Sequence, residues 1–204
     1  MKVISIVGAR PQFIKCAPLS KELRKKHEEI IIHTGQHYNK EMSALFFDEL
    51  KIPEPDYNLG IGSGSHGLQT GKMIIEIEKV LVSEDPDIVL VYGDTNSTFA
   101  GAIAASKLKK TIAHVEAGLR SFDKGMPEEV NRVVTDHLSQ LLLCPSQNAI
   151  DNLANEGIKD NVHNVGDLMV EALTNNLKLA SEKSDIINSL NLKGGCQKLW
   201  GCKA

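Results

Sequence analysis

The feature that most constrains the fold is a set of short apolar runs, each followed by a longer amphipathic segment. The runs occupy residues 3–7, 29–33, 87–92, 111–115 and 141–144. Near-continuous apolar runs of this length are typical of parallel strands that are buried on both faces. Their alternation with helical segments predicts an α/β fold, a Rossmann-like parallel sheet with helices on both faces.

The segments between these runs carry apolar residues at helical spacing. They predict helices over 13–26, 66–82, 96–108, 128–140, 146–155, 167–181 and 184–190. Asn96 or Ser97 is expected to cap the third of these helices, and Pro127 stands just before the fourth. In open parallel sheets, ligands bind outside the carboxyl ends of the strands, so the residues that follow each run are the candidates for a site.

Composition excludes several classes of protein. The 204 residues carry a net charge of −3, so no basic field indicates nucleic acid. No apolar run approaches the ~20 residues that span a bilayer, and the N-terminus predicts a first strand, not a signal peptide. Cys16, Cys144, Cys196 and Cys202 match no disulfide or zinc spacing, which is typical of unpaired cytoplasmic thiols.

Basic and polar residues follow the first two runs. Arg10 and Lys15 stand where the first helix begins and indicate an anion site there; alternatively, Arg10 caps a carbonyl and Lys15 is solvated. After the second run, Gln36 and His37 are expected to hydrogen-bond to substrate or to a neighbouring loop. His33 and His37 straddle a turn, which does not favour a metal pair.

Carboxylates follow the later runs. Asp94 follows the run 87–92, where Asp94 or Thr95 also suits a helix cap, and Glu116 directly follows the run 111–115. Glu128, beside Glu129, opens a helix, where an acid also suits the helix dipole. If Asp94, Glu116 and Glu128 converge opposite the two cations, one carboxyl pKa should rise into the range of a general acid or base. Such a site suits proton transfer at carbon with departure of an anionic leaving group.

Several stretches together resemble one family. They are "GARPQFIK", "TGQH", "VYGDTNST", "HVEAGLRS", "MPEEVNR" and "NVGD", in order over residues 1 to about 167. The chain is similar in these to the non-hydrolysing UDP-N-acetylglucosamine 2-epimerases. The first stretch departs from the usual G-T-R-P-E of the family at Ala9 and Gln12, while Arg10 and Lys15 are kept.

The resemblance implies a fold and an activity. The fold is the N-terminal half of a GT-B-like pair of Rossmann-like domains that face each other across a cleft. The activity interconverts UDP-N-acetylglucosamine and UDP-N-acetylmannosamine by elimination of UDP, through a 2-acetamidoglucal, and re-addition. Neither a nicotinamide nor a metal is required. Cytoplasmic location and a homodimer are expected, and a hydrolysing relative that releases UDP is the alternative within the same chemistry.

The resemblance also implies roles for individual residues. Asp94, Glu116 and Glu128 are the catalytic acid/base carboxylates. Arg10, Lys15 and Arg132 are the substrate-binding candidates, the first two near the diphosphate. Gln36 and His37 are candidates for a loop beside a second, regulatory UDP-N-acetylglucosamine site.

This chain differs from the family in its length, because family members are about twice as long. The resemblance stops near Lys193, before the second domain and its "T-x-H-R" motif. We therefore predict an N-terminal Rossmann-like domain at 1–166, a helical linker at 167–193 and an irregular tail at 194–204. Such a chain is expected to be inactive alone, and either to need a separate C-terminal half or to act as a non-catalytic sugar-nucleotide-binding module.

Overall fold

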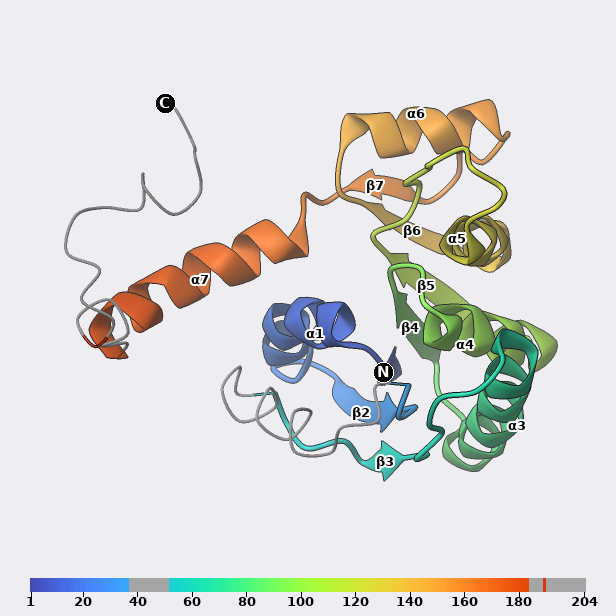
Figure 1. Ribbon diagram of the computed structural model, residues 1–204, viewed down its shortest axis with the longest axis horizontal. Helices are drawn as coiled ribbons and strands as arrows, with labels where there is room; N and C mark the ends of the chain where they lie inside the picture. Colours follow the sequence, from blue (N-terminus) through green and yellow to red (C-terminus); the bar gives the residue numbers. More distant parts are fainter. Residues whose placement is uncertain (37–51, 184–188, 190–204) are drawn as a thin grey trace.

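A computed structural model describes residues 1–36, 52–183 and 189 (Figure 1). Their strands form one parallel sheet in the order β3-β2-β1-β4-β5-β6-β7. The strands are β1 (Lys2–Val7), β2 (Glu28–His33), β3 (Tyr57–Asn58), β4 (Ile88–Tyr92), β5 (Thr111–Val115), β6 (Leu141–Cys144) and β7 (Val162–Asn164). The predicted α/β class with a parallel sheet is confirmed, and the strand order reverses direction between β1 and β4.

Helices cover both faces of the sheet. They are α1 (Arg10–Leu23), α3 (His66–Glu84), α4 (Asn96–Lys107), α5 (Pro127–Leu138), α6 (Gln147–Asn155) and α7 (Leu168–Lys183). Figure 1 shows α1 and α7 on one side of the sheet and α3, α4 and α5 on the other. Alternate strand residues supply the two cores: Ile4 and Val91 pack with α3 and α4, whereas Val7 and Tyr92 pack with α1.

The differences from the sequence-based prediction lie at the edges and ends of elements. β3 and β7 have two and three residues and lie at the two sheet edges, and neither forms an apolar run that would predict a strand. Of the residues that the sequence offered as caps of α4, the structure uses Thr95, whose hydroxyl accepts from the Thr98 N–H, and not Asp94, Asn96 or Ser97. Apart from Ser189, the helix predicted over 184–190 and the tail lie outside the described residues.

Gln12 ties together the chain at the point where the strand order reverses. Its side-chain oxygen accepts from the N–H groups of Gly8 and Ala9, at 2.7 and 3.0 Å. Its amide nitrogen donates to the Tyr92 carbonyl at 2.8 Å and to the Thr98 hydroxyl at 3.0 Å. An ionised glutamate can accept these bonds but cannot donate. Gln12, which stands where the family usually has glutamate, therefore satisfies hydrogen-bonding groups at the ends of both β1 and β4.

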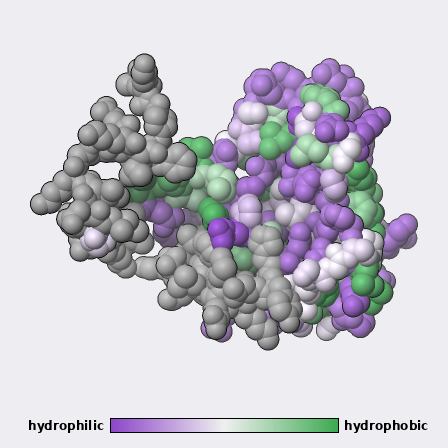
Figure 2. Space-filling view, in the orientation of Figure 1, coloured by the Kyte–Doolittle hydropathy of each residue, from purple (hydrophilic) through white to green (hydrophobic). Residues whose placement is uncertain are grey.

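The surface is mixed. Figure 2 shows mainly hydrophilic residues over the body of the molecule, with hydrophobic residues where α7 leaves it. On α7, Val170, Leu173 and Leu177 are each about 60% exposed, at helical spacing. Within the described part of the chain, no helix is long and apolar enough to cross a membrane.

Candidate active site

Glu116 is turned out of the sheet by the backbone. β5 ends at Val115, and Glu116 adopts a left-handed φ of 72° that is costly for a residue with a side chain. The N–H groups of Glu116 and Ala117 both donate to the Leu143 carbonyl, at 3.0 and 3.1 Å, and hold this turn. A backbone strain maintained by neighbouring hydrogen bonds is typical of a functional position.

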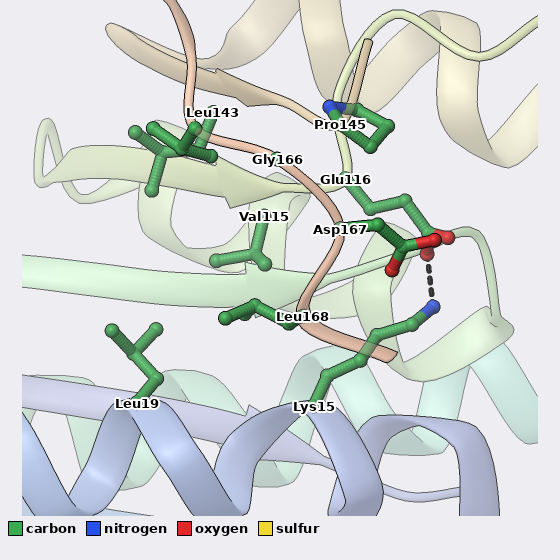
Figure 3. Close-up of a pocket in the computed structure, with 10 residues that line it drawn as sticks. Lys15, Leu19, Val115, Glu116, Leu143, Pro145, Gly166, Asp167 and Leu168 are labelled. Atoms are coloured by element: carbon green, nitrogen blue, oxygen red, sulfur yellow. Dashed lines mark hydrogen bonds and ion pairs between the residues drawn. The ribbon is translucent and has the colours of Figure 1, made fainter. Parts of the chain in front are cut away.

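Glu116 forms an ion pair with Lys15 of α1 (Figure 3). The Lys15 side chain is only 9% exposed and that of Glu116 21% exposed, so the pair is largely shielded from water. The interpretation of Lys15 as a solvated lysine is therefore wrong. Gly93 leaves room for the pair, because a Cβ there would lie 3.2 Å from Oε2 of Glu116 and 3.5 Å from Nζ of Lys15. The ends of β4 and β5 and the first turns of α1 thus meet at one place.

A second acid–base pair lies at the end of β4. Arg132 of α5 donates to Oδ2 of Asp94 at 2.5 Å and to Oε2 of Glu129 at 2.5 Å. The Asp94 carbonyl accepts from the side chain of Asn131 at 2.9 Å, which fixes the backbone here. Because Thr95 caps α4, the Asp94 carboxylate is not used as a helix cap and remains 35% exposed.

The two neighbouring glutamates at the start of α5 have different environments. Glu128 is exposed, and among the described residues it has no hydrogen bond or ion pair. Glu129 is buried and accepts from the N–H groups of Ser121 and Phe122, at 2.9 Å each. It therefore anchors the loop between β5 and α5. Helical spacing in the sequence did not distinguish these two roles.

In the described structure, two of the three predicted carboxylates, Asp94 and Glu116, lie just beyond the carboxyl ends of β4 and β5, and each is paired with a cation. Glu116 pairs with Lys15 and Asp94 with Arg132, instead of the carboxylates facing one another. Arg10 is exposed at the first residue of α1. The catalytic and substrate-binding roles of these residues stay predictions.

The loop after β2 is tied to α4. The side-chain oxygen of Gln36 accepts from the Ser97 N–H at 3.2 Å and from the Ser97 hydroxyl at 2.6 Å. Gln36 therefore satisfies a backbone N–H in the first turn of α4. The sequence predicted a bond to substrate or to a neighbouring loop, and the partner found here is a helix. His37 lies outside the described residues, so the regulatory role stays a prediction.

A cavity of about 150 Å³ opens beside the Lys15–Glu116 pair. Figure 3 shows its apolar wall, with the charged groups at one end. The lining includes Leu19, Val115, Leu143, Pro145, Val165 and Leu168, with Lys15, Glu116 and Asp167. Within residues 1–36 and 52–183, no group of three or more histidine, cysteine, aspartate or glutamate side chains is placed to hold a metal ion.

A network of charged side chains, most of them buried, joins β5, α5 and the turn after α6. The sequence analysis did not identify it. Nδ1 of His114 lies 2.6 Å from Asp136, Arg120 donates to Asp136 at 2.7 Å, and Arg120 binds both oxygens of Glu156 at 2.6 and 2.7 Å. Burial opposes ionisation of Asp136, but His114 and Arg120 outweigh it and hold the pKa of Asp136 below its usual value. The available signal was a histidine in a buried strand two residues before Glu116.

Lowering the pH should weaken the hydrogen bonds by which Glu129 holds the loop between β5 and α5. Burial opposes ionisation, but the N–H groups of Ser121 and Phe122 and the Arg132 guanidinium outweigh it and lower the pKa of Glu129 to about 2. A carboxyl group whose pKa is lowered by folding contributes its full stabilisation at pH values above its unfolded pKa, near 4.5. This stabilisation is lost as the pH falls toward 2.

We expect the change Glu129→Gln to remove this contribution, on the order of 2–3 kcal/mol at pH 7, and to flatten the loss of stability between about pH 4.5 and pH 2. Urea unfolding across this range measures it. Glu128→Gln is the matched control, since Glu128 is exposed and makes none of the contacts that hold Glu129. An equal effect of the two changes would contradict the anchoring role.

The fold and the site together define a class of protein. The chain is one Rossmann-like half of a GT-B-like protein, with acid–base pairs at the carboxyl ends of the strands. A lipopolysaccharide outer core galactosyltransferase shares this fold, with a TM-score of 0.56 over 82% of this chain and 46% of its own, at 17% identity. The model of the UDP-N-acetylglucosamine 2-epimerase family matches residues 21–195. The chain belongs to this family.

Curated relatives align with nearly the whole chain. A UDP-N-acetylglucosamine 2-epimerase homolog of Methanococcus maripaludis is 63% identical over 94% of this chain and 54% of its own length. The UDP-N-acetylglucosamine 2-epimerase of Methanocaldococcus jannaschii is 54% identical over 91% and 51%. A UDP-2,3-diacetamido-2,3-dideoxy-D-glucuronate 2-epimerase of Pseudomonas aeruginosa is 51% identical over 94% and 57%. The chain spans about half the length of the relatives that it matches.

Solved structures show the same relation. The M. jannaschii epimerase, crystallised with UDP-GlcNAc and UDP, matches with a TM-score of 0.89 and 54% identity over 93% of this chain and 53% of its own. The Neisseria meningitidis epimerase bound to UDP-GlcNAc matches with a TM-score of 0.86 and 35% identity over 94% and 52%.

Proposed function

We propose that this chain supplies the acid–base side of a UDP-N-acetylglucosamine 2-epimerase site. The Lys15–Glu116 pair carries the proposal, because it places a partly exposed carboxylate, on a left-handed turn, at the carboxyl edge of the sheet. Relatives that carry this activity in their names align over this part of the chain. The reaction interconverts UDP-N-acetylglucosamine and UDP-N-acetylmannosamine.

The chemistry assigns roles to the charged groups. A carboxylate takes the proton from C2 of the sugar, the C1–O bond breaks, a C1=C2 double bond forms and UDP leaves as an anion. Re-addition of UDP with a proton delivered to the other face of C2 gives the epimer. Glu116, Asp94 and Glu128 are the carboxylates for these proton transfers. Arg10, Lys15 and Arg132 are the cations for the diphosphate and its developing charge.

The chain alone, which supplies only the acid–base side of the site, is not expected to catalyse the epimerisation. Elimination and re-addition need the sugar nucleotide held in one orientation and shielded from water, which takes groups on both sides of a cleft. We expect no UDP-N-acetylmannosamine from the purified 204-residue chain, and product once the C-terminal half of the M. maripaludis relative is added.

Chromatography of the nucleotide sugars and calorimetry with UDP-N-acetylglucosamine measure this. Binding heat without product, even with both halves, would support a non-catalytic binding module instead. Free UDP together with N-acetylmannosamine would indicate a hydrolysing enzyme. Full turnover by the chain alone would contradict the need for a second side.

A second substrate is favoured by one observation. The P. aeruginosa relative named for UDP-2,3-diacetamido-2,3-dideoxy-D-glucuronate is 51% identical over 203 aligned residues, close to the 54% of the M. jannaschii epimerase. Both names describe inversion at C2, so the same carboxylates serve either sugar. A competition assay with the two UDP-sugars on the paired halves distinguishes them by the ratio of kcat/KM.

A further inference from the structure

We infer that His114 is a positioning residue that carries protons on both ring nitrogens and, as an imidazolium, fixes the backbone from which Asp94 projects. His114 lies in β5 with its side chain fully buried. Its Nδ1 lies 2.6 Å from Oδ1 of Asp136, and its Nε2 lies 2.7 Å from the Gly93 carbonyl oxygen. The two nitrogens thus face partners on α5 and at the end of β4.

Both partners accept hydrogen bonds and neither can donate one. A backbone carbonyl has no proton, and an ionised carboxylate has none either. A neutral imidazole has one N–H and one lone pair, so either tautomer would place a lone pair against a partner oxygen at under 3 Å. The doubly protonated ring satisfies both contacts, and each becomes a charge-assisted hydrogen bond.

The surrounding charges are consistent with a buried imidazolium. Asp136 is held in its ionised form because its other oxygen accepts from Arg120 at 2.7 Å and from the Gly118 N–H at 3.1 Å. Glu156, the residue that follows α6, balances Arg120. Cys144 of β6 adds no charge, since burial raises the pKa of its thiol to about 11. The cluster therefore has two cations and two anions.

The consequence for the site lies in the backbone of Gly93. Its N–H donates to the Val115 carbonyl at 2.9 Å, and its carbonyl accepts from the ring of His114. Asp94 follows Gly93 directly, and Glu116 follows Val115. Two bonds from one strand therefore fix the two carboxylate-bearing turns relative to each other. This positioning role rests on the proposed function, whereas the protonation state of His114 does not.

Nitrogen NMR of the 204-residue chain, labelled with ¹⁵N in histidine and recorded at about pH 7.5, tests the protonation state directly. A histidine with the ordinary pKa near 6.5 is about nine-tenths neutral there. We expect His114 to show two N–H nitrogens. Through-bond correlation to the backbone assigns the ring without a variant. One bare nitrogen on His114 would overturn the inference.

Two variants separate charge from position. Asp136→Asn removes the compensating anion, and its amide can donate to Nδ1, so we expect His114 to become the neutral Nε2–H tautomer with the Gly93 carbonyl signal little moved. His114→Phe removes the donor, so the Gly93 carbonyl and Asp94 amide signals should move clearly.

If His114→Phe does not fold, cross-peaks from the Nε2 proton to the Asp94 amide in the unsubstituted chain report the same contact. Unmoved Gly93 and Asp94 signals in folded His114→Phe, or missing cross-peaks, would contradict positioning. Absence of epimerase activity in the paired halves would leave these spectra unchanged, so failure of the proposed function is distinguishable.

Discussion

Replacing Glu116 with glutamine is expected to lower epimerase turnover about 10²–10⁴-fold in the chain joined to the C-terminal half of its M. maripaludis relative. Glutamine keeps the size of the side chain and still accepts a hydrogen bond from Lys15, but it cannot take a proton from C2. Deuterium incorporation at C2 from heavy water, measured by mass spectrometry, should fall with turnover. The fold should be retained, as judged by circular dichroism.

Glu84→Gln is the matched control for that change. Glu84 is about as exposed as Glu116, 19% against 21%, and forms an ion pair with Lys2 at 2.6 Å. Lys2 begins β1, so this pair lies at the amino ends of the strands, away from the proposed site. We expect its turnover to be unchanged. Near-normal turnover of the Glu116→Gln protein would make Glu116 a structural partner of Lys15 and remove it from the proton chemistry.

Replacing Asp136 with alanine is expected to lower the free energy of unfolding of the 204-residue chain by about 3–5 kcal/mol. The change leaves Arg120, whose side chain is 1% exposed, and fully buried His114 without the anion between them. It also leaves the Gly118 N–H without its acceptor. Urea unfolding followed by circular dichroism gives the difference.

Asp151→Ala measures the background for that experiment. Asp151 is exposed on α6 and accepts one hydrogen bond, from Gln147 at 2.9 Å. Substitutions at such surface positions usually change stability by no more than about 0.5 kcal/mol. A loss below about 1 kcal/mol for Asp136→Ala would mean that the buried charges rearrange or take up water, and it would weaken the argument for a buried imidazolium.

Much of the fold was predictable because its signals are local. The central strands are continuous apolar runs, so their burial on both faces and parallel pairing follow from the sequence. β3 and β7 were not predictable, since two or three edge residues gain their strand conformation from pairing with β2 and β6. The cap of α4 was assigned to Thr95 by its hydroxyl geometry, which neighbouring polar residues in a sequence do not reveal.

The sequence by itself determined the class of fold, the family and the sheet edge at which the charged residues gather. Only the tertiary structure decided their partners. Glu116 meets Lys15 across 101 positions of sequence, and His114 meets Asp136 across 22. Hydrophobic periodicity reports which residues are buried, because burial depends on local spacing. A hydrogen bond or an ion pair depends on the atoms that the folded chain brings within about 3 Å, and no local pattern contains that distance.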